Sequence, residues 1–123
     1  MEPPLITVDT IHSEVIARPG HPTPASARVQ IELGEPIRNG RILSVGFTLS
    51  KETPFARTVV TGVVAITSDS DEELDELAKR LAEDSGPPPE ILWYVLLRLQ
   101  PLILLVEDYM GVPPIPVLPG PQL

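Results

Sequence analysis

The C-terminal third of the chain contains the feature that most restricts its fold. The run from Ile91 to Val106 is apolar except for Arg98, Gln100 and Pro101. A helix that is apolar on every face cannot lie at the surface of a 123-residue monomer. We therefore expect the protein's own sheet to cover one side of this helix. A partner subunit or a bound polypeptide is expected to cover the other side.

Prolines and glycines mark both ends of this run. A triple proline at 87–89 supplies helix-starting φ angles, and Gly111 is a candidate C-cap. The long helix is predicted over about 89–110, with a kink at Pro101, which removes one hydrogen bond. The C-terminal tail, residues 111–123, is apolar and spaced by prolines, which favours an extended polyproline form.

The first part of the chain, about residues 5–67, has the alternation of strands. Four segments are rich in β-branched residues: 5–17, 28–33, 41–50 and 55–67. The alternation of the first segment slips near Asp9. A slip of this kind indicates a bulge. Asn39-Gly40 predicts a hairpin turn, and 51–54 a polar turn. The fourth segment is apolar on both faces, as in a strand that is central or covered on both sides. Together the segments predict a four-stranded antiparallel meander.

A short acidic helix is predicted over about 71–84. Ser70 and Glu73 have the spacing of a capping box, and leucines follow at helical period. The segment 69–84 carries eight acids and two bases, a net −6 of the chain's −8. No basic stripe is present, which argues against nucleic acid and anionic lipid as partners.

The totals restrict the class of protein further. The length predicts one domain, 1–123, of α+β class: the meander, the acidic helix and the long apolar helix. Cysteine is absent, which excludes disulfides and thiolate metal sites. No charged-then-apolar segment opens the chain, so a cytoplasmic location is expected. The apolar run falls short of the ~20 residues needed to cross a bilayer, so no membrane insertion is expected.

No residues form a recognisable catalytic arrangement. His12 and Glu14 are two apart on the first strand and share one face, so a metal or acid–base role is one alternative beside a solvated strand face. No glycine-rich phosphate loop or nucleophile elbow is found. We therefore predict no catalytic residues, no bound metal and no cofactor, and we do not expect an enzyme.

Self-association is predicted through the long helix. Four strands and one small helix cannot wrap an apolar cylinder on all sides. The chain is therefore expected to form a homo-oligomer, a dimer or a tetramer. The predicted interface residues are Trp93, Leu97, Leu102, Leu105 and Val106.

The order of these parts resembles the SecB protein-export chaperone family. Two segments are similar to the second and third strands of that family: Val29-Gln30-Ile31-Glu32-Leu33 and the strand from Gly40 to Leu49. The segment from Thr53 to Ile66, with Phe55 after the turn and Gly62 midway, is similar to its fourth strand. The start of the family's long helix is similar to Pro89-Glu90-Ile91-Leu92. The segment that leaves that helix is similar to Gly111-Val112-Pro113 and Leu118-Pro119.

This resemblance implies a chaperone that holds unfolded or extended polypeptides in apolar grooves. It also implies a dimer of dimers with long helices at the interfaces. The client-binding residues implied in this chain are Val112, Ile115, Val117 and Leu118. The alternative is an obligate homo-oligomeric structural protein whose helix and tail only pack on neighbouring subunits.

Overall fold

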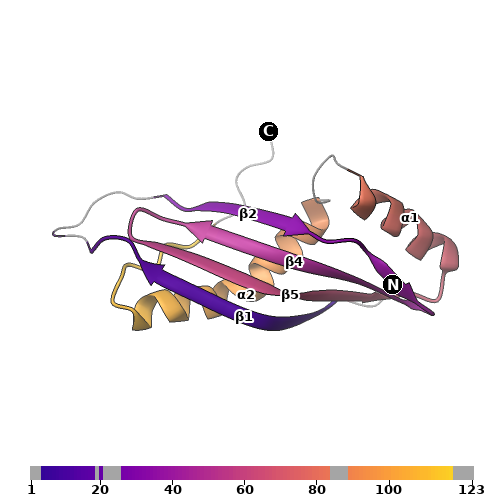
Figure 1. Ribbon diagram of the computed structural model, residues 1–123, viewed down its shortest axis with the longest axis horizontal. Coiled ribbons are helices and arrows are strands. Elements are labelled where there is room, and N and C mark those ends of the chain that lie inside the picture. The colour runs from indigo at the N-terminus through magenta and orange to yellow at the C-terminus, as the bar shows by residue number, and fades with distance from the viewer. Residues whose placement is uncertain (1–3, 19, 21–25, 84–88, 118–123) are drawn as a thin grey trace.

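The chain folds into one antiparallel sheet with a long helix across one face. A computed structural model describes residues 4–18, 20, 26–83 and 89–117. The elements are β1 (Leu5–Val15), β2 (Arg28–Leu33), β3 (Ile37–Asn39), β4 (Ile42–Glu52), β5 (Ala56–Thr67), α1 (Asp71–Ala82) and α2 (Pro89–Tyr109). α2 lies behind the sheet and α1 lies at one end of it (Figure 1). The predicted α+β class, the antiparallel sheet and both helices are confirmed.

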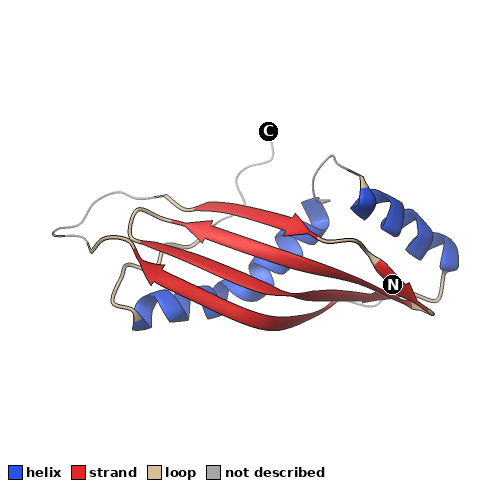
Figure 2. Cartoon of the chain, viewed as in Figure 1, coloured by secondary structure: helices blue, strands red, loops and turns tan. Residues whose placement is uncertain are grey.

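The order of the strands differs from a simple meander. β2, β4 and β5 are neighbours in chain order, but β1 pairs with β5 and lies at the opposite edge from β2 (Figure 2). A short extra strand, β3, pairs with β4. The connection between β1 and β2, residues 16–27, is long enough for β1 to lie at the far edge of the sheet. β5 is therefore central, as its two apolar faces predicted.

Both predicted turns are present, but each lies further along the chain than predicted. At Asn39-Gly40, Asn39 pairs with Ile42 and Gly40 has a φ of 63°, so Gly40 and Arg41 form a two-residue hairpin turn. The predicted polar turn at 51–54 begins later than expected, because β4 continues through Glu52. This shift moves Lys51 from a turn into the sheet.

The predicted bulge in β1 is present. Val8 pairs with Gly62 and Thr10 with Thr61, so Asp9 is the extra residue. A Cβ at Gly62 would collide with the Thr7 carbonyl oxygen and lie 2.8 Å from Phe47 Cζ. Gly62 therefore permits the close approach of β1 and gives room to the Phe47 ring.

We expect Gly62→Ala to destabilise the protein by about 1–3 kcal/mol, because the added methyl group overpacks this crossing. Gly46 provides a matched control in the neighbouring strand, since a Cβ there would meet no atom closer than 3.8 Å. Urea unfolding of both variants measures the difference. Equal stability of the two variants would contradict the close approach at Gly62.

The core lies between the sheet and α2. Alternate residues of β4, from Leu43 to Leu49, face the helix together with their partners in β5, and most are fully buried. From α2, the buried side chains are Ile91, Val95, Leu96, Leu99, Ile103 and Glu107. Three leucines of α1, at 74, 77 and 81, join the same cluster.

One charged pair is buried in this core. Lys51 continues the inward alternation of β4, and its Nζ donates to Glu107 Oε1 at 2.7 Å. Both side chains are only 1% exposed. Charges this far from water require a partner, so the pair joins the end of β4 to the last turn of α2.

Lys51→Met should cost about 3–5 kcal/mol of unfolding free energy, because it leaves the Glu107 carboxylate buried without a partner. The double variant Lys51→Met/Glu107→Leu should regain wild-type stability or exceed it. Arg57→Met is the control: Arg57 and Glu52 form an exposed pair at 3.5 Å, worth less than about 1 kcal/mol. Chemical denaturation compares the three. A double variant as unstable as Lys51→Met would show that packing, not charge, determines the loss.

Both helices have well-defined ends. Ser70 caps α1 by accepting the Glu73 N–H, as predicted, while the Glu73 carboxylate accepts from the Ser68 hydroxyl. α1 ends at Ala82, two residues earlier than predicted. Arg80 pairs with Glu90 at the start of α2. The Glu90 backbone amide and then Arg80 hold the pKa of the Glu90 carboxyl below its usual range.

α2 continues through Pro101 and ends in a glycine turn. Gly111 has a φ of 74°; its N–H donates to Asp108 O, and the Val112 N–H donates to Glu107 O. These two bonds form a Schellman motif, so the predicted C-cap is confirmed. By length and composition α2 could also cross a membrane. Core helices share these properties, and its buried side chains here face the sheet.

Candidate functional site

The face of α2 turned away from the sheet carries an exposed apolar stripe. Leu97 is 51% exposed, Leu105 52% and Tyr109 83%. Pro101 is also exposed, so the four residues, which we name the outer stripe, follow each other at intervals of four. Residues at this spacing lie on one side of a helix. The outer stripe is an apolar surface that no described residue of the same chain covers.

The predicted interface residues are divided between two sides of α2. Leu97 and Leu105 belong to the outer stripe. Trp93 is half-buried and packs against the core cluster, and Leu102 and Val106 are half-buried. Tyr109 was missed, although its spacing from Leu105 was visible in the sequence. The interface itself stays a prediction.

The C-terminal tail packs against its own chain. Val112 is 4% exposed and forms a small cluster with Phe55 and Ala56, which Val15 and Ile115 join. Val117 is half-buried and packs against the main core cluster. The fourth predicted client-binding residue, Leu118, lies outside the described residues. Three of the four residues therefore face inward, and whether any of them contacts a client stays a prediction.

Two polar side chains hold the tail in this position. Gln100 Oε1 accepts the Val117 N–H at 2.7 Å, so the tail turns back along α2. Arg18 Nη1 donates to Met110 O at 2.8 Å and to Gly111 O at 3.0 Å. A cation here also complements the carbonyl end of the helix. Sequence reasoning missed both: Gln100 was only an interruption of the apolar run, and Arg18 is far from Met110 in the chain.

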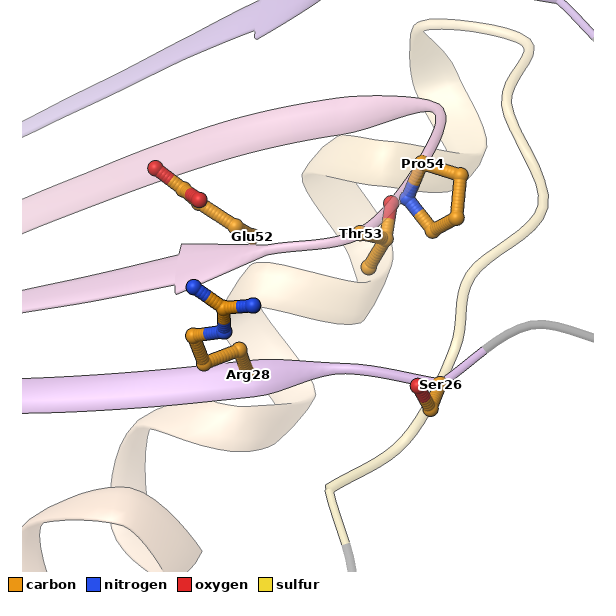
Figure 3. A pocket seen from close by; sticks show the side chains of 5 residues that line it. All are labelled: Ser26, Arg28, Glu52, Thr53 and Pro54. Atoms are coloured by element: carbon orange, nitrogen blue, oxygen red, sulfur yellow. The ribbon is translucent and has the colours of Figure 1, made fainter.

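The tail passes the turn between β4 and β5, beside a small polar hollow. The hollow has a volume of about 280 Å³ and is lined by Ser26, Arg28, Glu52, Thr53 and Pro54 (Figure 3). The Thr53 hydroxyl accepts the N–H groups of Phe55 and Ala56, at 3.1 Å each. Thr53 thus fixes the turn, and with it the position of Phe55 under the tail.

The opposite face of the sheet carries both polar and apolar side chains. His12 and Glu14 lie there, exposed and on the same face as predicted. Within the described ranges, no three metal-ligating side chains lie together. A second hollow of about 320 Å³ is lined by Gly34, Gly46 and Gly62 with Asp9, Glu32, Leu33, Phe47, Thr48 and Thr61.

Comparison with known proteins gives a structural match alone. No protein-family model and no curated protein matches the sequence. Among solved structures, the fold is similar to a SecB-like chaperone of Mycobacterium tuberculosis, solved in complex with a ChAD peptide from the HigA1 antitoxin. The TM-score is 0.65 at 9% identity, over 94% of this chain and 87% of that chain. The predicted SecB-like fold is therefore confirmed.

Proposed function

We propose that this protein is a chaperone that holds unfolded or extended polypeptides against apolar surfaces in the cytoplasm. The observation that carries the proposal is the SecB-like fold, which is shared over 94% of the chain with a chaperone bound to a peptide. Within this chain, the proposal is supported by the apolar surface beside α2 and by an extended apolar segment that already packs there.

The energetics of such binding are adequate. Burying an aliphatic side chain of leucine size contributes roughly 1.5–3 kcal/mol. A micromolar dissociation constant corresponds to about 8 kcal/mol, so several such side chains together are needed to reach it after the cost of ordering an extended segment. That strength suits a chaperone that has to release its client.

The first test is solution mass by light scattering after size exclusion, with and without a chemically unfolded model protein. The proposal expects an oligomer, a dimer or a tetramer, whose mass rises when the unfolded protein is added. An oligomer of unchanged mass would contradict general client binding. It would leave either a single dedicated client or the structural role described next.

A second candidate function is that of an obligate homo-oligomer with no general client. The exposed outer stripe favours it, because three large apolar side chains along one helix face suit a second copy of the same helix. Both functions predict a homo-oligomer, and binding of the unfolded protein distinguishes them.

Leu105→Asp should dissociate the oligomer into smaller species, because it places a charge in the centre of the outer stripe. Light scattering gives the mass, and circular dichroism confirms that the variant remains folded. Lys79→Asp, at an exposed position on α1, introduces the same side chain away from the stripe and should leave the mass unchanged. A folded Leu105→Asp variant of wild-type mass would exclude the outer stripe as the interface.

A further inference from the structure

We infer that the surface under the tail is a polypeptide-binding site and that the chain's own residues 112–117 occupy it until a client displaces them. This inference rests on the proposed function and specifies its site. The tail surface consists of Val15, Phe55 and Ala56 at one end, and of Gln100 with the adjoining core cluster at the other.

The tail contacts this surface as an extended client segment would. It has neither helix nor strand from 113 to 117, and prolines at 113, 114 and 116 fix an open backbone. Its apolar side chains bind at two places: Val112 and Ile115 on the small cluster, and Val117 on the main core. The anchors are β-branched aliphatic residues spaced i, i+3 and i+5.

Gln100 contacts the main chain of the occupant, not its side chains. Its amide oxygen accepts the N–H of residue 117, a group that every residue except proline carries. Recognition of this kind is independent of sequence. The three prolines also show that the surface binds a chain without pairing it as a strand, since proline donates no ladder hydrogen bond.

The two ends of the segment are held with different strength. At the start, Val112 is buried, its N–H is bonded within the Schellman motif, and Arg18 holds the two carbonyl groups before it. Further along, Ile115 and Val117 are only half-buried. Displacement therefore begins at 115–117 and releases Val112 last.

The site consequently selects clients by class. It takes extended segments with branched aliphatic side chains at the spacing of the tail, with proline or glycine tolerated between them. The covalently attached tail competes at an effective concentration of roughly millimolar, as for short flexible linkers. Free segments of equal intrinsic affinity therefore bind the wild-type protein weakly.

The test uses a fluorescein-labelled peptide with the sequence of residues 111–123, and anisotropy measured against the full chain. Val117→Asp removes one anchor from the attached tail and leaves the tail surface intact. The peptide should bind this variant at least tenfold more tightly than wild type. Pro116→Asp adds the same charge at an exposed neighbouring position and should bind the peptide no more than about threefold more tightly than wild type.

Two controls keep the result decisive. A peptide with Asp in place of both Ile115 and Val117 should not bind any variant. If Val117→Asp proves unfolded by circular dichroism, Ile115→Asp replaces it, because Ile115 packs on the small cluster and not on the main core.

The sign of the change distinguishes the two roles of the tail. Equal or weaker peptide binding by a folded Val117→Asp variant would overturn the inference, since a tail that contacts clients directly predicts weaker binding. Capture of unfolded protein by the wild type is measured separately. If the wild type captures unfolded protein but wild type and Val117→Asp bind the peptide with equal affinity, this inference is wrong and the chaperone function stands. If the peptide binds more tightly but no unfolded protein is captured, the site stands without the chaperone function.

Discussion

The position of α2 on the sheet depends on the buried pair of Lys51 and Glu107. Apolar contacts alone would tolerate a helix that slides along the sheet, because one leucine can replace another in a similar hole. The charged pair does not tolerate this, since a shift by one turn would leave two buried charges without partners. Glu107 lies in the last turn of α2, so the pair also holds the end of the helix, and with it the start of the tail, at one place on the sheet.

Much of the fold could be predicted from local pattern. The bulge at Asp9, the cap at Ser70 and the C-cap at Gly111 were all visible, because each arises from residues close together in the chain. The partner of β1 could not be predicted, because strand alternation determines which face is buried but not which neighbour is chosen. Lys51 was placed in a turn for a related reason: a lysine is normally exposed, and its buried partner is in a distant helix.

The candidate site was predicted in part. The apolar residues of the tail were recognised, and three of them are in contact with apolar parts of the chain. Their direction was not foreseen, because a proline-spaced apolar segment has the same sequence whether it faces a client or its own core. Gln100 and Arg18 contribute through main-chain atoms far away in sequence, and no local pattern marks such contacts.

The pairing of β1 with β5 has a consequence for synthesis of the chain. The strand of the sheet that is synthesised first pairs with the strand that is synthesised last, Leu5 with Ala65, and the helix that covers their inner face follows only after both. Such non-local pairing folds slowly and leaves apolar strands uncovered until late. During its own synthesis this protein thus passes through an extended, apolar state of the kind that chaperones bind.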